Sequence, residues 1–598
     1  MLSNKKETIF GCLLVATILS IFYSTYIFKT IAPNVEGWFE TYANEIVNGK
    51  IPYKDFYLFT TPAFVYYLSI FIKVFGTKLY ILHIAGALYH IACGIVVYIL
   101  LNFLLKNSLY SVIVSVISLA VSSIDTGEPF TYYNHFAILW QLLSILLLTA
   151  NDRKYSLLSG CSVFLCFLSK QSIGLIWIFT YFTALFLVIF VNKKYSRKFI
   201  YSVIGFVLCA IVYITYLYVT DSLKEFFEAI FFKGASSKGN PVDVLLRPIY
   251  PAVKLPEFLY PLITGLVINL FFICNRKFGK VSSKQKYYIS LFNKYLFTIV
   301  LFLLFIFSIK NYYNYSITFR FISRTLMYSG VIYAIFIIMK SLSYYKEKNE
   351  SLFLHKNFIL LMFACSGLSL WYSLGMSFPI YEPVAVSTIP LLYINIYKNS
   401  VKENSSDSDY SKFNPFFVFS SCILVWIALL IKFIHPWDWT YWTEPSVFAS
   451  NEKSSLDEKL VHFKLSSSTI STLDHVISNI KNNSKSQNDV FIYPYFPLFY
   501  VLCDKHPYTY SFVQFIDVCP DFVLQRDLNT LKSKLPEVLV TLDCPRDVVN
   551  ELNNSFRSNG EKIQLKFYDY LEQIKSKYIL VSKDYFNKDM YISVYVKK

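Results

Sequence analysis

Apolar and polar residues along this chain fall into long alternating blocks. Mainly apolar runs recur from Thr8 to about Trp426, and short polar stretches separate them. A helix needs about 20 such residues to cross a bilayer. By this criterion the pattern predicts roughly thirteen transmembrane helices, near Thr8–Phe28, Leu79–Leu105, Ser108–Ser123, His135–Ala150, Ser156–Ser169, Ile173–Val191, Phe199–Val219, Phe258–Cys274, Tyr287–Ile309, Thr325–Ile338, Phe358–Met376, Val384–Ile396 and Phe416–Phe433.

The composition excludes a water-soluble globular protein. Of the 598 residues, 55% are hydrophobic and only 16% are charged. We therefore expect a polytopic α-helical membrane protein, with residues 1–434 forming its transmembrane domain.

The net charge of +17 reflects topology, because Lys and Arg gather in alternate loops. Cytoplasmic loops are enriched in these residues. The pattern therefore predicts a multi-pass protein of the plasma (inner) membrane, with a cytoplasmic N-terminus and an extracytoplasmic C-terminus. Nucleic-acid binding is not expected. The basic loops are at Lys5-Lys6, Lys106, Arg153-Lys154, Asn192–Lys198, Asn275–Lys286, Lys346–Glu350 and Lys398/Lys402.

The tail, residues 435–598, is more polar and mixes helix-like with strand-like segments. Ser471–Asn483 has the periodicity of a helix. Short β-branched and aromatic runs predict strands, at Asp489–Phe496, Pro536–Asp543, Tyr578–Ser582 and Met590–Val596. This alternation predicts an extracytoplasmic soluble α/β domain.

The first outer loop, residues 30–77, contains the stretch "EGWFETYANEIVNGKIPYKDF". Asn34 and Gly49 are expected to cap and end a short helix. Glu36 and Glu40 would share one face of it. Its apolar residues, such as Trp38 and Tyr42, could lie on the bilayer surface. A second surface helix is expected within Thr61–Gly76, which is short for a span.

This loop resembles the first loop of polyprenyl-phosphate-dependent membrane glycosyltransferases with the GT-C fold, such as the protein O-mannosyltransferases and the lipid A aminoarabinose transferase. The family's Asp-Glu pair is matched by Val35-Glu36, and its second acidic element by Asp55-Phe56 with "TTP" at Thr60–Pro62. "FLSKQSIGL" (Phe167–Leu175) is similar to a further family element. The resemblance extends to the architecture of most of the chain. Individual residues are similar only in the first loop and in the element Phe167–Leu175.

The resemblance implies transfer of a sugar from a polyprenyl-phosphate carrier to a lipid, glycan or protein acceptor. A carboxylate takes the acceptor proton in such a reaction, and cationic or polar groups hold the phosphate. Val35 replaces the usual catalytic Asp and cannot take a proton, so Glu36 or Asp55 would be the base, or the chain is inactive. Lys170 is the leading phosphate-binding candidate, because ionisable residues near membrane depth are usually functional, and snorkelling of its side chain to the interface is an equal explanation.

Other candidates for substrate binding are Lys310, Arg320, Arg324, Asn134 and His135. Interfacial anchoring is an equal explanation for the two arginines, and capping or packing explains Asn134 and His135. No His or Cys spacing predicts a metal cluster, and the sequence leaves dependence on a divalent metal ion open.

Two other classes of protein are compatible with the sequence. A transporter would carry ionisable residues in the middle of its spans. A non-catalytic relative that acts in cell-envelope polysaccharide assembly would explain Val35. An oligosaccharide polymerase or ligase would share the chemistry but act on a lipid-linked oligosaccharide.

Overall fold

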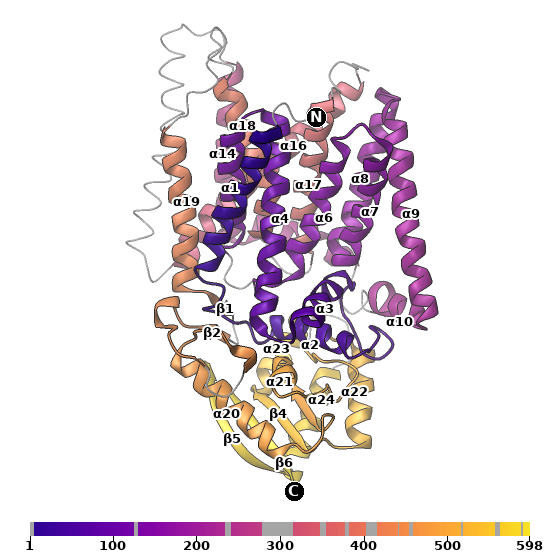
Figure 1. The fold of residues 1–598 in the computed structure, drawn as a ribbon, viewed down its shortest axis with the longest axis vertical. Helices are drawn as coiled ribbons and strands as arrows, with labels where there is room; N and C mark the ends of the chain where they lie inside the picture. The colour runs from indigo at the N-terminus through magenta and orange to yellow at the C-terminus, as the bar shows by residue number, and fades with distance from the viewer. Residues whose placement is uncertain are drawn as a thin grey trace.

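The computed structural model describes most of the chain as a helical bundle above a smaller mixed α/β part (Figure 1). The described residues are 5–124, 130–233, 241–277, 315–346, 355–376, 382–401, 415–439, 442–453, 458–515, 518–556, 563–587 and 590–598.

The bundle helices confirm twelve of the predicted apolar segments, and the segment Tyr287–Ile309 lies outside the described residues. Six helices are long and apolar enough to cross a membrane: Lys5–Ser24, Leu79–Leu105, Gln171–Val191, Tyr195–Val219, Arg320–Ser343 and His355–Gly375. The bundle helices are α1 (Lys5–Ser24), α4 (Leu79–Leu105), α5 (Ser108–Ser122), α6 (Tyr133–Leu148), α7 (Arg153–Ser169), α8 (Gln171–Val191), α9 (Tyr195–Val219), α14 (Pro256–Lys277), α16 (Tyr315–Lys346), α17 (His355–Gly375), α18 (Ala385–Val401) and α19 (Pro415–Ile434).

Large apolar side chains on the outside of the bundle indicate a lipid-facing surface. On α9, Val212 is 70% exposed and Val219 is 76% exposed. Contiguous apolar surface of this kind is unfavourable in water and favourable in a bilayer. This chain is therefore a multi-pass membrane protein.

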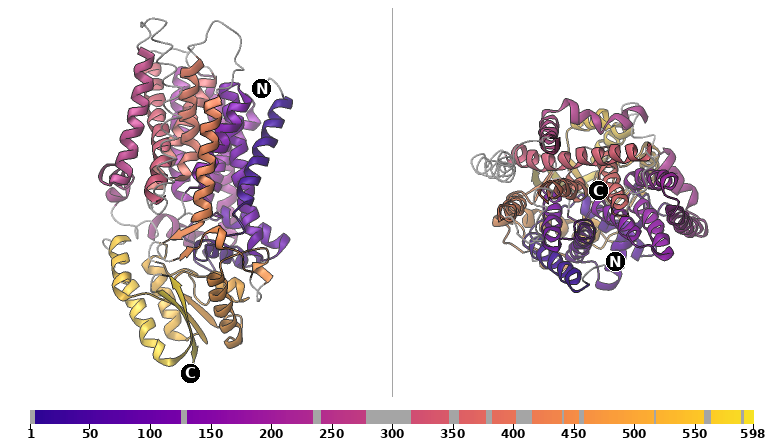
Figure 2. Two further views of the ribbon diagram at one scale, coloured as in Figure 1. Left: turned by 90° about the vertical axis from the view of Figure 1, so that its left-hand side faces the viewer. Right: turned by 90° about the horizontal axis from the view of Figure 1, so that it is seen from above.

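The start of α1, with Lys5 and Lys6, lies at the end of the bundle away from the C-terminal part (Figure 2). There the buried ammonium of Lys198 donates to the carbonyls of Leu148 and Ala150. His355 hydrogen-bonds the neighbouring carbonyl of Thr149 at 2.8 Å. These contacts fix the ends of α6, α9 and α17 to one another at this end of the bundle.

Short helices lie at the other end of the bundle. They are α2 (Val35–Val47), α3 (Ala63–Phe75), α10 (Leu223–Phe227), the π-helix η1 (Glu228–Phe232), α12 (Pro241–Leu246), α13 (Ile249–Lys254) and the 3₁₀ turn η4 (Glu382–Val384). Among them, α2 and α3 lie between the bundle and the C-terminal part (Figure 1). α3 forms within the predicted segment Thr61–Gly76, and it is amphipathic, with Phe64 buried and Ile70 exposed.

The prediction that α2 lies on the bilayer surface is wrong. Trp38, Phe39 and Tyr42 are almost fully buried, because the C-terminal part covers the side of α2 that the bundle leaves open. Asn34 precedes the helix, but its side chain makes no capping hydrogen bond. Gly49 follows the helix with φ of 88°, a left-handed conformation that suits glycine.

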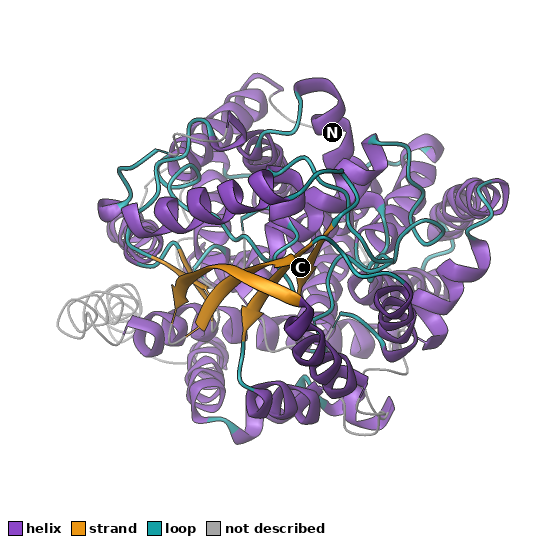
Figure 3. Ribbon diagram, turned by 90° about the horizontal axis from the view of Figure 1, so that it is seen from below, coloured by secondary structure: helices purple, strands orange, loops and turns teal. Residues whose placement is uncertain are grey.

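The C-terminal part contains a four-stranded mixed sheet in the order β3-β4-β6-β5, surrounded by helices (Figure 3). β3 and β4 are parallel, and the other neighbours are antiparallel. All four predicted strands and the predicted helix are confirmed. The elements are β1 (Trp437–Trp439), β2 (Trp442–Glu444), η5 (Val447–Ala449), η6 (Glu458–Leu460), α20 (Ser467–Asn483), β3 (Val490–Tyr493), α21 (Leu498–Leu502), α22 (Asp521–Ser533), β4 (Val538–Asp543), α23 (Arg546–Phe556), α24 (Ile563–Ile574), η7 (Lys575–Lys577), β5 (Tyr578–Asn587) and β6 (Met590–Lys597).

The first loop and the C-terminal part share one hydrophobic core. The ring of Phe512 stacks on Tyr42 and on Phe56, each with centroids 5.0 Å apart. Around this stack, the backbone N–H of Tyr57 donates to the carbonyl of Tyr510 at 2.8 Å. The C-terminal part therefore fixes the first loop against the bundle.

Asp527 of α22 is fully buried behind the segment that carries Phe512. Its carboxylate accepts hydrogen bonds from the backbone N–H of Ser511 at 3.2 Å and from the amide of Gln514 at 3.3 Å. Burial raises the pKa of Asp527 from an ordinary 3.8 to about 7, although these hydrogen bonds act in the opposite direction. The Asp527 carboxyl group therefore binds its proton more tightly in the folded protein than in the unfolded chain.

Asp527 should make thermal stability fall as the pH rises. Because its pKa is higher in the folded state, its stabilising contribution is complete below about pH 4 and is lost by about pH 7. Asp527→Asn keeps an oxygen for Ser511 and removes the titration. We expect the melting temperature of the variant, relative to wild type, to rise from pH 4 to 7 and then level off. A constant difference across this range would contradict the prediction.

Candidate functional site

Glu36 is buried at the start of α2, where it joins three segments of the chain. Its Oε2 accepts from the backbone N–H of Ala32 at 2.9 Å and lies 3.2 Å from Nε2 of His83, on α4. Its Oε1 accepts from the backbone N–H of Thr131 at 3.4 Å. Glu36 is 4% exposed and His83 is fully buried. The carboxylate thus fixes the first loop to α4 and to the segment before α6.

The Glu36–His83 contact joins two buried ionisable side chains. Nδ1 of His83 faces the carbonyl of Ile27, which only accepts, so Nδ1 donates to it. Nε2 of His83 faces Oε2 of Glu36. A buried charge with such a partner is stabilised far better than an isolated one.

α2 carries two more buried carboxylates. Glu40 is 1% exposed and follows Glu36 by one turn, so both lie on the same face of the helix. Glu45 is fully buried, forms an ion pair with Lys50, and binds Nδ1 of His506 in the C-terminal part at 2.7 Å. Burying a charged group costs free energy, so packing alone does not explain three buried carboxylates on one thirteen-residue helix.

Lys170 lies between α7 and α8, at the end of the bundle that faces the first loop. Its ammonium donates to Oδ1 of Asn134 at 2.6 Å and lies 4.7 Å from the ring centroid of Tyr133. Lys170 is 7% exposed and Asn134 is fully buried. The sequence predicted both residues separately, and the structure places them in contact.

The start of α6 connects the surroundings of Glu36 and Lys170. Thr131 binds Glu36, and Tyr133 and Asn134 contact Lys170. The ring of Phe39 on α2 packs edge-on against Tyr133, with centroids 5.2 Å apart. The predicted candidate His135 points elsewhere, towards the hydroxyl of Ser122 at 3.2 Å.

Gln171 is a site residue that the sequence reasoning missed. Its Nε2 donates to the carbonyl of Phe59 at 3.0 Å. Its Oε1 accepts from the hydroxyl of Thr60 at 3.1 Å and from the N–H of Thr61 at 3.3 Å. These bonds join the "SKQ" and "TTP" segments. A polar residue beside Lys170, at the break between two apolar helices, is the signal that could have indicated it.

Asp55 lies on the exposed turn between α2 and α3. Its Oδ2 accepts from the backbone N–H of Ile51 at 2.7 Å, which fixes the carboxylate within its own turn. The neighbouring Lys54 donates to the carbonyl of Thr220, beyond the end of α9, at 3.2 Å. The side chain of Asp55 is exposed to solvent, whereas that of Glu36 is buried.

The predicted arginines lie on α16. Arg324 is 4% exposed and lies 3.4 Å from carboxylate oxygens of both Glu257 and Glu382. It also covers the ring of Phe258, 3.9 Å from its centroid. Arg320 is half-buried one turn earlier. Lys310, the remaining cationic candidate, lies outside the described residues.

Metal ligands do not gather in the part of the chain that the structure describes: no group of three or more His, Cys, Asp or Glu side chains there could hold a metal ion.

Comparison with known proteins gives a distant structural similarity. No family model and no curated protein matches the chain. Two structures of ArnT from Cupriavidus metallidurans are similar: one bound to undecaprenyl phosphate, with a TM-score of 0.45, and one in the apo state, with a TM-score of 0.44. Each has 10% sequence identity, and the alignments cover 97% of both chains. At these values the similarity assigns no activity.

Proposed function

We propose that this protein is a membrane glycosyltransferase. It transfers a sugar from a polyprenyl-phosphate carrier to a hydroxyl group of a glycan, lipid or protein acceptor on the extracytoplasmic side. The proposal is carried by the buried ammonium of Lys170, which lies beside a first loop whose sequence resembles that of carrier-dependent glycosyltransferases. A cation held near membrane depth suits a phosphate that enters from the lipid.

Each candidate residue has a different role in this proposal. Lys170 binds the phosphate of the carrier, and Asn134 and Gln171 position it. Asp55 accepts the proton of the acceptor hydroxyl, because its exposed carboxylate can be approached. Glu36 already receives hydrogen bonds from two backbone N–H groups and faces His83, so we assign it a positioning role. Arg324 neutralises two carboxylates and is assigned to the fold.

The proposed arrangement in the membrane follows the charge of the loops. The basic end of the bundle is cytoplasmic, so the first loop and residues 435–598 are extracytoplasmic. Residues 1–434 form the membrane domain and residues 435–598 form the soluble one. The acceptor reaches the site from the aqueous side, and the carrier reaches it from the bilayer.

Sugar transfer by carboxylate variants tests the proposal. The full-length protein in lipid nanodiscs is given a panel of radiolabelled polyprenyl-phosphate sugars with cell-envelope acceptors. We expect wild type to use at least one donor and Asp55→Asn to lose roughly 100-fold or more in rate, as for a general base, with unchanged carrier binding. Glu40→Gln, which changes a buried carboxylate of α2, is the variant with which Asp55→Asn is compared. A wild type that binds carrier but transfers from no donor would overturn the proposal, and full activity of Asp55→Asn would overturn the assignment of the base.

A further inference from the structure

The turn that carries Asp55 contains a strained residue. Tyr53, two positions earlier, has φ of 69°, a left-handed conformation that residues with a Cβ rarely adopt. Its N–H donates to the carbonyl of Phe56 at 2.8 Å, which closes the turn and leaves Lys54 and Asp55 exposed at its tip. Strain of this kind persists only where surrounding contacts enforce it, and it is concentrated at functional sites. The contacts of Tyr53 therefore help to set the direction of Asp55.

The C-terminal part holds both ends of this turn through one residue, Tyr510. The hydroxyl of Tyr510 donates to the carbonyl of Tyr53. The carbonyl of Tyr510 accepts from the backbone N–H of Tyr57 at 2.8 Å. Burial raises the pKa of Tyr510 to about 12, so the hydroxyl keeps its hydrogen and acts as the donor. Asp55 lies midway in sequence between the two residues that Tyr510 binds.

Tyr510 is in turn fixed by α22. The guanidinium carbon of Arg526 lies 3.6 Å from the centroid of the Tyr510 ring, which is a cation–π contact. The next residue of α22, Asp527, accepts from the backbone N–H of Ser511 at 3.2 Å. Two consecutive residues of one helix therefore hold the side chain of Tyr510 and the backbone that follows it.

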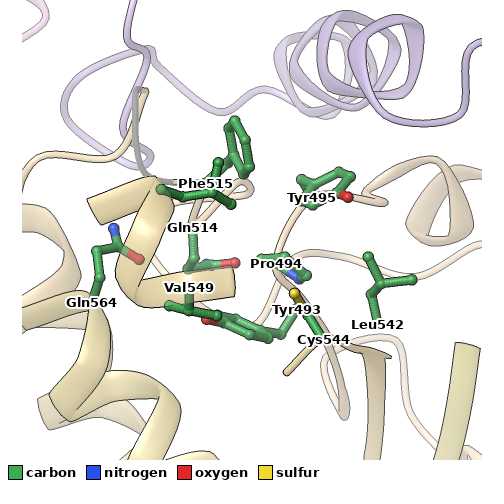
Figure 4. A pocket seen from close by; sticks show the side chains of 10 residues that line it. Tyr493, Pro494, Tyr495, Gln514, Phe515, Leu542, Cys544, Val549 and Gln564 are labelled. Carbon is green, nitrogen blue, oxygen red and sulfur yellow. The ribbon is translucent and has the colours of Figure 1, made fainter. Parts of the chain in front are cut away.

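The buried amide of Gln514 braces the loop on both sides of Tyr510. Its Nε2 donates to the hydroxyl of Thr509 at 3.1 Å and to the carbonyl of Ser511 at 2.8 Å. The backbone N–H of Gln514 donates at 2.8 Å to the carbonyl of Pro494, beside which it lies in Figure 4. The loop thus has a fixed conformation of its own, which an element that positions another one requires.

We propose that Tyr510 is a positioning residue, through which the C-terminal part directs the carboxylate of Asp55 towards the acceptor. This inference rests on the proposed glycosyltransferase function and on Asp55 as its base. Oδ2 of Asp55 already accepts from the N–H of Ile51 at 2.7 Å, so the direction of the other oxygen follows the conformation of the turn. Without the Tyr510 hydroxyl, Tyr53 is free to leave its strained conformation, and the carboxylate then turns away from the reacting hydroxyl.

Tyr510→Phe tests the proposal, because it removes one hydroxyl and keeps the ring. In sugar transfer by the full-length protein in nanodiscs, we expect kcat to fall about tenfold or more, with an unchanged KM for the carrier. Tyr508→Phe is the matched control, since the Tyr508 hydroxyl donates to the carbonyl of Lys534 at 2.9 Å, within the C-terminal part. It should keep the wild-type kcat. The double variant Asp55→Asn/Tyr510→Phe should be no slower than Asp55→Asn, because Tyr510 acts through Asp55.

Hydrogen–deuterium exchange of the turn gives a readout that needs no activity. The backbone N–H groups of Tyr53, Asp55 and Tyr57 are hydrogen-bonded in the folded protein. Loss of the Tyr510 hydroxyl should weaken this local structure and speed the exchange of its N–H groups. We expect peptides that span residues 51–57 to exchange several-fold faster in Tyr510→Phe than in wild type or in Tyr508→Phe.

Several outcomes would decide the proposal. A wild-type kcat in Tyr510→Phe would overturn it, whether or not exchange becomes faster. A further loss of rate in the double variant would also overturn it, because Tyr510 would then act independently of Asp55. Equal losses of kcat in Tyr508→Phe and Tyr510→Phe would indicate a general structural effect and reject it. If wild type transfers no sugar, the glycosyltransferase function is rejected, and unchanged exchange in Tyr510→Phe separately rejects the hold of Tyr510 on the turn.

Discussion

Lys170→Met is expected to reduce sugar transfer by about 100- to 1,000-fold, the range seen when one charge-stabilising group is removed from an active site. In the proposed reaction, negative charge develops on the carrier phosphate as the sugar leaves, and the Lys170 ammonium is the buried cation beside the first loop. Methionine has a similar length without the charge. The variant should therefore keep its fold and lose both transfer and carrier affinity.

Lys198→Met is the matched control. Lys198 is also buried, but it binds the carbonyls of Leu148 and Ala150 at the opposite end of the bundle. The Lys198→Met variant should have a lower melting temperature than wild type, without a comparable loss of sugar transfer. Lys170→Arg should restore part of the activity, since the charge is retained. If Lys170→Met transferred sugar at the wild-type rate, Lys170 would be a structural residue.

Local properties of the chain predicted the bundle and the sheet. The length and apolarity of a segment are enough to indicate a membrane helix, and β-branched residues indicated strands β3 to β6. The environment of α2 could not be predicted in this way. Trp38 and Tyr42 would pack equally well on lipid or on protein, and the groups that cover them, such as Phe512 and Tyr495, come more than 450 residues later in the chain.

The sequence predicted several residues of the candidate site, but not which residues contact one another there. Sequence patterns indicated Glu36, Asn134 and Lys170 as polar residues near membrane ends. They did not indicate that His83 faces Glu36 or that Asn134 binds Lys170, because each contact joins different helices. The buried Gln514, which binds Asp527, was not predicted at all, since a glutamine in a soluble segment is usually on the surface.

The Glu36–His83 pair should contribute strongly to stability. Glu36→Gln keeps an oxygen for only one of the two backbone donors, Ala32 or Thr131, and removes the carboxylate that faces buried His83. Removing one partner of a buried ion pair costs about 3–5 kcal/mol. We expect a large decrease in the melting temperature of this variant. The double variant Glu36→Gln/His83→Gln should recover part of the loss, because neither remaining side chain can then carry a charge.

Two comparisons separate this stabilising role from catalysis. Asp569→Asn breaks the half-exposed Arg546–Asp569 pair, 2.8 Å apart, and should lower the melting temperature far less than Glu36→Gln does, because exposed ion pairs contribute little to stability. Well below its melting temperature, folded Glu36→Gln should still transfer sugar, because the proposed base is Asp55. If Glu36→Gln instead melts like wild type and loses transfer, Glu36 is the base.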